Sequence, residues 1–228
     1  MADLPDLGIA YRFERATGDD DAGPPLTVLV LHGAGADEHA LVGTARRIAP
    51  GAAVLSPRGA FGHDGGGYRH LPPPPEEAPA VVHDPDLPTP AEQAVHARAA
   101  ELAGFLAAAS DALGLDAGNV CALGFADGAT AAVGMFYDHP ERLRGAVVLS
   151  ARPPFRPPRG RILDKKQVFC ATGRHDDSVT MDDYEELVEG LVTAGADVEL
   201  HWYDIGHEIA DQEVDDARAW LEKRLAPS

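Results

Sequence analysis

Three short motifs carry residue types suited to nucleophilic chemistry. Gly124-Phe125-Ala126-Asp127-Gly128 has the form G-x-S-x-G, a sharp turn that lifts its central side chain above a sheet edge, but alanine stands at the centre. Gly173-Arg174-His175-Asp176 and Gly206-His207 add a carboxylate and an imidazole further along the chain. A nucleophile, an acid and a histidine in that order could carry out acyl transfer through a covalent intermediate. Because a methyl group cannot attack a carbonyl, the attacking atom of such a site is missing.

A fourth motif, His32-Gly33-Ala34-Gly35, follows the apolar run Leu26–Leu31, which is typical of a parallel strand covered on both faces. Each of the other three motifs also follows a predicted strand. Open sheets of parallel strands bind their ligands at the carboxyl ends of the strands. The four motifs are therefore expected to meet at one edge of a sheet.

Strands and helices alternate along the whole chain. The predicted strands are residues 9–16, 26–31, 52–56, 119–123, 144–149, 167–172 and 198–204, and the predicted helices are residues 39–48, 90–113, 129–137, 181–194 and 213–225. This alternation predicts an α/β fold with a mostly parallel twisted sheet and helices on both faces. The length of 228 residues, without a repeat or long linker, predicts a single domain over residues 1–228. Residues 60–90 are rich in Pro and Gly and are predicted to form a long irregular loop near the site.

The composition restricts the partners and the compartment. A net charge of −18 excludes nucleic acid and disfavours an anionic membrane surface. The first residues carry neither a basic region nor an apolar run, and no apolar stretch is long enough to span a membrane, so a cytoplasmic protein is predicted. Cys121 and Cys170 lie in predicted strands; with one strand between them they are about 9–10 Å apart, too far for a disulfide. Both are predicted to be buried free thiols.

Together the motifs resemble the α/β-hydrolase fold, and within it the small carboxylesterase/phospholipase/thioesterase-like family, whose members have no separate cap domain. The resemblance runs from about Leu26 to Leu225. The dienelactone hydrolases, which use a cysteine nucleophile, resemble the chain more distantly. The matching segments are Leu31-His32-Gly33-x-Gly35-x-Asp37-Glu38, Gly124-Phe125-x-x-Gly128-Ala129, Gly173-x-x-Asp176-x-x-Val179 and Gly206-His207. Four motifs in this order are far more specific than any one of them.

The resemblance implies a role for each matched position. Position 126 would hold the attacking serine, His207 would be the general base, and Asp176 would orient the imidazole. Asp177 and His175 compete with Asp176, which the Asp-x-x-Val spacing favours. The backbone N–H groups of Ala34 and Asp127 would form the oxyanion hole. Whether the Asp127 carboxylate would repel the oxyanion or cap the following helix stays open.

The resemblance also implies substrate contacts, and it implies no cofactor. His32, Gly33, Tyr68, Arg69 and Phe155 are the predicted substrate-binding residues, although Tyr68, Arg69 and Phe155 could equally belong to plain surface loops. A metal site from His63, Asp64 and His70 is not expected, because no strand or helix orients these side chains. The implied partner is a small-molecule ester, and a homodimer is open by analogy with small hydrolases of this type.

Alanine at position 126 leaves three hypotheses. The chain is an engineered knock-out of a serine esterase, a natural protein that binds a ligand or partner without turnover, or an enzyme that uses His207 for non-hydrolytic acid–base work. The intact His207, Asp176 and residues 32–35 favour the first, because an abandoned site should lose its partners. Ser150, Cys121 and Ser178 are poor replacements, since neither Ser150 nor Cys121 is expected on a strained turn.

Overall fold

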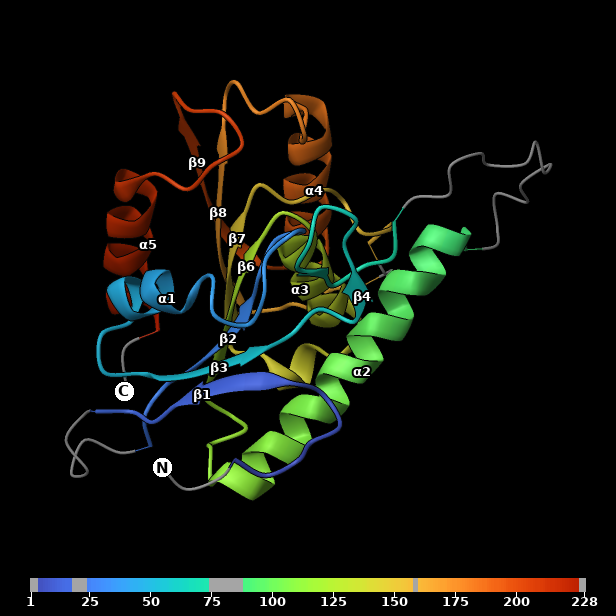
Figure 1. Ribbon diagram of the computed structural model, residues 1–228. Coiled ribbons are helices and arrows are strands. Elements are labelled where there is room, and N and C mark those ends of the chain that lie inside the picture. The colour runs from blue at the N-terminus through green and yellow to red at the C-terminus, as the bar shows by residue number, and fades with distance from the viewer. Residues whose placement is uncertain (1–3, 18–23, 74–87, 158–159, 226–228) are drawn as a thin grey trace.

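The computed structural model describes residues 4–17, 24–73, 88–157 and 160–225, and its central feature is a seven-stranded sheet (Figure 1). The strand order is β1-β3-β2-β6-β7-β8-β9. Strand β1 pairs antiparallel with β3, and every other neighbouring pair in this sheet is parallel. The strands are β1 Tyr11–Glu14, β2 Thr27–Leu31, β3 Ala53–Pro57, β6 Val120–Phe125, β7 Gly145–Leu149, β8 Gln167–Gly173 and β9 Asp197–Tyr203. The predicted mostly parallel sheet is confirmed.

Helices cover both faces of this sheet, as predicted. Helices α1 (Val42–Ile48) and α5 (Asp211–Arg224) lie on one face, and α2 (Pro90–Leu113), α3 (Asp127–Asp138) and α4 (Met181–Thr193) lie on the other (Figure 1). A short 3-10 helix, η2 (Pro140–Arg142), follows α3. Each layer closes over its own cluster of buried apolar side chains. Strands β2, β3 and β7 are buried at every position, which explains their continuous apolar sequences.

The predicted irregular segment 60–90 contains regular structure that sequence patterns did not indicate. Strands β4 (Phe61–Gly62) and β5 (Tyr68–Arg69) form a small antiparallel hairpin. Its second strand binds the loop after β2, because Gly35 N–H donates to the Tyr68 carbonyl at 2.9 Å and Tyr68 N–H donates to the Ala36 carbonyl at 2.7 Å. The prediction failed here because a two-residue strand is too short to show any alternation. Residues 74–87 of the predicted loop lie outside the described part of the chain.

The two cysteines are free and buried, as predicted. Cys121 lies in β6 and Cys170 in β8, with β7 between them. Burial raises the pKa of both thiols to about 12, so both stay protonated at neutral pH. Within the ranges that the structure describes, every helix is too short or too polar to cross a membrane.

Candidate active site

Ala126 occupies a strained turn between β6 and α3. Its backbone has φ 53° and ψ −122°, a conformation that side chains of L-residues rarely adopt. Two hydrogen bonds hold it: Ala126 N–H donates to the Leu149 carbonyl at 3.0 Å, and the Ala126 carbonyl accepts from Thr130 N–H at 3.0 Å. The position therefore has the conformation that a nucleophile elbow requires, with a methyl group where an attacking atom would stand.

The two glycines of this motif are required by close packing. A Cβ at Gly124 would overlap the main chain of Ala129, and a Cβ at Gly128 would overlap the carbonyl oxygen of Leu31. Helix α3 thus begins in direct contact with the ends of β2 and β6. This contact brings the turn at Ala126 next to the loop that follows β2.

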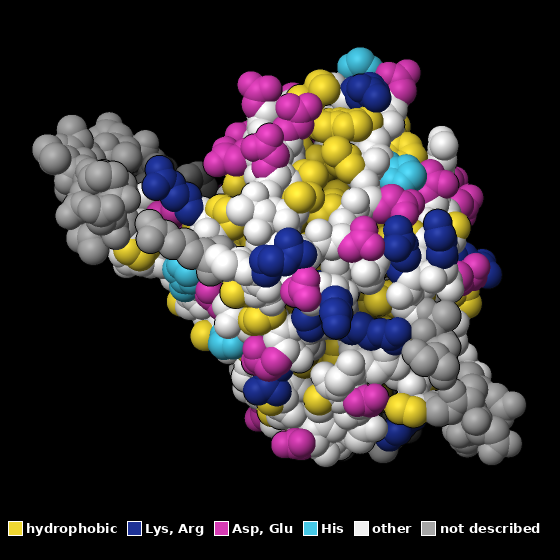
Figure 2. Space-filling model, turned by 180° about the vertical axis from the view of Figure 1, so that it is seen from behind, with side chains coloured by type: hydrophobic (Ala, Val, Ile, Leu, Met, Phe, Trp, Pro, Cys, Tyr) yellow, Lys and Arg dark blue, Asp and Glu magenta, His cyan; other side chains and the backbone are white. Residues whose placement is uncertain are grey.

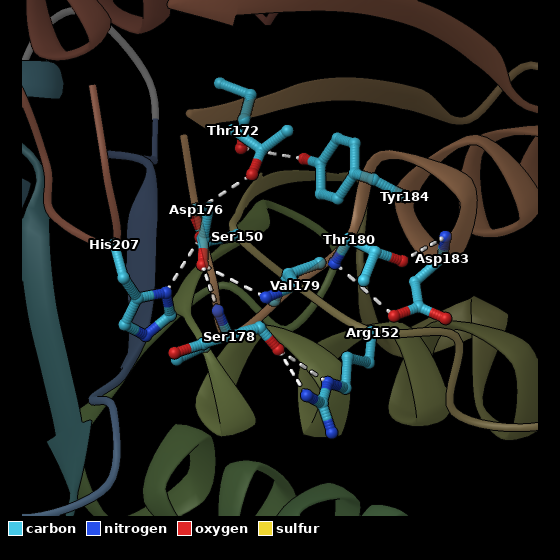
Figure 3. A network of polar contacts seen from close by, with 12 residues as sticks. Ser150, Arg152, Thr172, Asp176, Ser178, Val179, Thr180, Asp183, Tyr184 and His207 are labelled. Carbon is cyan, nitrogen blue, oxygen red and sulfur yellow. Dashed lines mark hydrogen bonds and ion pairs between the residues drawn. The ribbon is translucent and has the colours of Figure 1, made fainter. Parts of the chain in front are cut away.

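His207 and Asp176 form a hydrogen-bonded pair (Figure 3), and the His207 ring lies 4.9 Å from the ring of Phe125, the residue before the turn. His207 Nδ1 lies 2.8 Å from Asp176 Oδ2, and Asp176 Oδ1 accepts from the N–H groups of Ser178 at 2.8 Å and Val179 at 3.0 Å. Burial raises the pKa of Asp176, but the hydrogen bonds from His207, Ser178 and Val179 outweigh it and leave the pKa below its ordinary value. An ionised Asp176 makes Nδ1 the protonated ring nitrogen, so Nε2 is the one left to accept a proton.

Asp176 is the residue of this loop that hydrogen-bonds to His207; its sequence neighbours His175 and Asp177 do not. The His175 side chain is exposed and pairs with Asp204 at 2.6 Å, and Asp177 is exposed. Because Asp176 sits on the loop after β8 and His207 on the loop after β9, their contact depends on the parallel pairing of these two strands.

A cavity of about 460 Å³ brings these parts together. Ala126, His207, Ala34 and Asp127 share its wall with Arg69. Asp127 is the first residue of α3, whose N–H has no partner within the helix. The remaining wall is mainly apolar, with hydroxyl groups at three positions, and consists of Leu71, Pro72, Ala91, Val95, Thr130, Ser150, Arg152, Pro153, Pro154, Ser178 and Val179. Most of these residues carry no motif, so sequence analysis missed them.

The Asp127 carboxylate does not cap helix α3, one of the two roles considered for it, but binds the segment after β5. One of its oxygens, Oδ2, accepts hydrogen bonds from His70 N–H at 2.8 Å and Leu71 N–H at 3.4 Å. Burial raises the pKa of Asp127, and these two hydrogen bonds oppose the rise only in part. Asp127 therefore ties the segment after β5 to the elbow and holds Arg69 and Leu71 against the cavity.

The predicted substrate-binding residues divide into two groups. Arg69 lines the cavity, whereas His32, Gly33, Tyr68 and Phe155 are not among its lining residues. His32 is fully buried; its Nε2 accepts from Gly59 N–H at 2.9 Å, so Nδ1 donates to the Gly33 carbonyl at 2.9 Å. The Tyr68 ring lies under the Arg58 guanidinium at 4.5 Å, and the Phe155 ring stacks on His96 at 4.1 Å. In these contacts the side chains support the loops around the cavity.

Ser150 differs from expectation. It is the residue after β7, it lines the cavity, and its φ of 50° places it on a strained turn, where the sequence predicted none. Its hydroxyl lies 3.3 Å from the Thr172 hydroxyl. Its N–H donates to the Ala171 carbonyl of the adjacent strand at 2.9 Å, so the ladder between β7 and β8 continues up to this turn.

A buried network behind the loop 32–36 was also missed. Arg98 of α2 is 2% exposed; it donates to the Arg58 carbonyl at 3.2 Å and lies 3.0 Å from His70 Nδ1. Burial, with the nearby Arg98 and His32, lowers the pKa of His70 well below its ordinary value, so His70 is neutral and can accept this hydrogen bond. The available signal was the spacing of Arg98 with Val95 and Leu102, which places it on the buried face of the helix.

We expect Arg98→Met to lower the free energy of unfolding by about 2 kcal/mol, because it leaves the Arg58 carbonyl and His70 Nδ1 without a donor. Urea denaturation measures this loss. Arg218→Met is the matched control: its half-exposed pair with Glu222 contributes less than about 0.5 kcal/mol. If the two variants lose the same free energy of unfolding, the buried Arg98 hydrogen bonds contribute no more to stability than an exposed ion pair does.

The described residues contain no group of three or more His, Cys, Asp or Glu arranged to hold a metal ion. Of the three residues considered for such a site, His70 points into the buried network with Arg98 and His32. The His63 ring lies beside Gly35 and Gly65 instead.

Comparisons with known proteins agree with this geometry. The "Putative hydrolase MhqD" of Bacillus subtilis (strain 168) is 28% identical over 215 residues, which are 93% of this chain and 98% of that protein. The crystal structure of the Bacillus cereus carboxylesterase has a TM-score of 0.80 and 28% identity, and covers 95% of this chain and 94% of its own. A carboxylesterase from Mesorhizobium loti has a TM-score of 0.76 and 27% identity, over 97% of this chain and 96% of its own.

A family model decides the classification. Residues 75–223 match the dienelactone hydrolase family, which the sequence motifs had placed at a greater distance than the serine esterases. The predicted α/β-hydrolase resemblance is confirmed by this match and by the carboxylesterase structures. Because the match covers more than half of its residues, the chain belongs to the dienelactone hydrolase family, within the α/β-hydrolases.

Proposed function

We propose that this chain is a carboxylic ester or thioester hydrolase of the serine type whose nucleophile has been replaced by Ala126. As it stands, the chain binds a small ester and does not turn it over. The observation that carries the proposal is that His207, paired with Asp176, and the strained turn at Ala126 lie on the wall of one cavity. A site with all of its supporting contacts intact favours a recent, inactivating substitution over a long-abandoned site.

The proposed chemistry follows from the positions of these groups. A serine at position 126 would attack the ester carbonyl while His207 Nε2 takes its proton. The N–H groups of Ala34 and Asp127 would stabilise the oxyanion, each by about 3 kcal/mol. His207 would then return the proton to the leaving alkoxide or thiolate, and water activated by His207 would release the acid from the acyl-enzyme. With alanine, only the carbonyl-binding part of this sequence is left.

The cavity supports a small substrate. A volume of about 460 Å³ suits a compact molecule, and its mainly apolar walls suit an acyl or alcohol group without charge. Arg69 contributes a cation at the same wall, and its Nε is buried without a hydrogen-bond partner among the described residues. We therefore propose Arg69 as a residue that contacts the polar part of the ester, as the sequence predicted.

A second candidate function keeps the same site without hydrolysis. The His207–Asp176 pair could act as an acid–base catalyst on a ligand held in the cavity, or the cavity could serve binding alone. The favouring observation is that the pair is complete although position 126 offers no nucleophile. Under this candidate, a serine at position 126 would not create a reactive hydrolase.

Covalent labelling tests the proposal. We expect a fluorophosphonate probe to leave this chain unmodified and to add one phosphonyl group to the Ala126→Ser variant, located at residue 126 by intact-mass and peptide mass spectrometry. Ser150→Ala in the serine variant is the matched control and should label equally, because Ser150 lines the same cavity. An adduct at Ser150 of the unmodified chain would overturn the assignment of position 126. The absence of an adduct in both proteins would overturn the serine-hydrolase chemistry.

A further inference from the structure

Among the residues that the structure describes, no strand pairs with the outer side of β9. It is the last strand in the sheet order, and it pairs with β8 on its other side. Asp197 N–H donates to the Lys166 carbonyl and the Tyr203 carbonyl accepts from Arg174 N–H, so both point toward β8. Because main-chain groups alternate along a strand, those of Val198, Leu200 and Trp202 point to the open side. Such an edge is a template for another strand unless it is covered.

The side chains of these same three residues form an apolar row on the α4 face of the sheet. Val198, Leu200 and Trp202 are only partly buried, and the Trp202 ring meets Tyr184 of α4 edge-on at 5.8 Å. The alternate residues, Glu199 and His201, point to the α5 face, where the His201 ring stacks on Phe169 at 4.9 Å. The edge thus has one apolar face and one polar face.

Helix α4 extends this apolar row with a stripe that its own core packing does not use. The helix buries Tyr184, Leu187 and Leu191. At about 100° per residue, Met181, Val188 and Val192 lie on a different side of the helix, in line with Glu185. Met181 is 42% and Val192 53% exposed, and Val188 is partly buried.

Figure 2 shows hydrophobic side chains gathered in the upper part of the molecule, bordered by acidic side chains. Helix α4 packs beside β9, where Tyr184 meets Trp202, and we call the exposed and partly buried apolar residues of the two elements the α4–β9 surface: Met181, Val188, Val192, Val198, Leu200 and Trp202. A contiguous apolar surface next to an open strand edge is typical of a site of association.

We propose that a second copy of this chain covers the α4–β9 surface, with the two β9 strands antiparallel about a two-fold axis at Leu200. Two-fold symmetry requires one patch to be complementary to itself. In this register Leu200 faces Leu200 of the second copy, and Val198 faces Trp202 of the second copy. These are the residues whose N–H and carbonyl groups point outward, so each pair can exchange two hydrogen bonds.

The charges fit the same register. Glu199 and His201 pair with each other within the chain at 3.1 Å. In this register Glu199 also faces His201 of the second copy at a non-hydrogen-bonded position, where side chains lie closest, so the acid and the base of each strand meet those of the other. A shift by two residues would instead place Glu199 opposite Glu199 or His201 opposite His201. The register centred on Leu200 is thus the one in which Glu199 does not face Glu199 and His201 does not face His201 of the second copy.

Net charge sets how the association responds to salt. Two chains of net charge −18 repel each other, and five of the carboxylates belong to α4, with Glu185 inside the apolar stripe; they are Asp182, Asp183, Glu185, Glu186 and Glu189. Salt screens this repulsion and leaves apolar contacts and main-chain hydrogen bonds in place. We expect the dimer to tighten as the ionic strength rises from 0.02 to about 0.3 M.

Sedimentation equilibrium tests the proposal. We expect this chain to form a dimer of twice its 24.0 kDa mass, and Leu200→Pro to sediment as a monomer. Proline is tolerated at an edge position whose N–H points outward, so β8–β9 pairing is retained while pairing with a second copy is blocked. Circular dichroism shows whether this variant is folded. Phe61→Ser, an exposed residue of β4, is the control and should leave the dimer unchanged.

Charge exchange provides a second test that does not depend on proline. Glu199→Lys alone should weaken the dimer by about tenfold, because a lysine would face His201 of the second copy. Adding His201→Glu should restore the dissociation constant to within about threefold of the starting value. A chain that is monomeric at every concentration would overturn the proposal. A dimer that neither Leu200→Pro nor the charge variants affect would overturn it too, because the interface would lie elsewhere.

Discussion

The Ala126→Ser variant is expected to hydrolyse p-nitrophenyl acetate with a kcat about a million-fold above that of the chain with alanine. Loss of a triad serine costs about this factor in a serine protease, and here His207 and Asp176 are paired, with His207 and position 126 on the wall of the same cavity. The φ of 53° at position 126 strains alanine and serine alike, so the substitution should leave the fold unchanged. The measurement is release of p-nitrophenol, with an initial burst that equals the enzyme concentration if deacylation is the slow step.

The histidine provides the control for this prediction. In the serine variant, His207→Asn should remove nearly all of the gain, because serine without a base is a weak nucleophile. In the alanine chain, the same substitution should change the rate very little, since groups that act as a unit are not additive. A serine variant that gains no activity, or one whose activity survives His207→Asn, would contradict the assignment of His207 as the base.

Elements with strong local signals could be predicted from the sequence almost to the residue. Helix α2 has the predicted bounds 90–113 because its limits are encoded locally. Thr89 and Glu92 form a reciprocal capping box, Pro90 starts the first turn, and Gly114 ends the helix with φ 71°. The buried parallel strands were equally clear, since apolar runs of strand length lie between turns.

For the candidate site, the sequence could predict where the backbone places each motif but not which contacts each side chain makes. The order of strands brought Ala126, Asp176 and His207 to one end of the sheet, and the structure also brings Asp176 to His207. Side-chain roles that depend on distant segments were not visible. His32 looked available for substrate, but Gly59, 27 residues away, satisfies its ring, and Asp127 binds the main chain of His70 across 57 residues. No local pattern encodes such contacts.

Glu213 is expected to make the protein lose stability as the pH rises through neutrality. The residue is 1% exposed; its Oε2 accepts from Ala210 N–H at 2.8 Å, and its Oε1 is buried without a partner among the described residues. Burial raises its pKa to about 7, and the nearby carboxylates of Asp176 and Glu208 add to the rise, which the hydrogen bond from Ala210 opposes. The folded protein therefore prefers the protonated acid.

The direction of the pH effect follows from proton binding. Between the ordinary pKa of about 4.5 and the folded value of about 7, the unfolded chain has released a proton that the folded chain still holds. The free energy of unfolding falls across this window, by about 3 kcal/mol in total at 1.36 kcal/mol per pKa unit. Asp176 acts in the opposite direction and at lower pH, because its pKa is lowered in the folded protein.

The variant Glu213→Gln should remove this loss. Glutamine keeps an acceptor for Ala210 N–H but does not ionise, so the variant should gain about 3 kcal/mol over the unmodified chain on going from pH 4.5 to pH 8. Urea denaturation across this range provides the measurement. Glu222→Gln, on the exposed face of the same helix, is the matched control and should follow the unmodified chain throughout. If the Glu213→Gln profile runs parallel to that of the unmodified chain, Glu213 does not titrate in this window, and burial does not raise its pKa as argued.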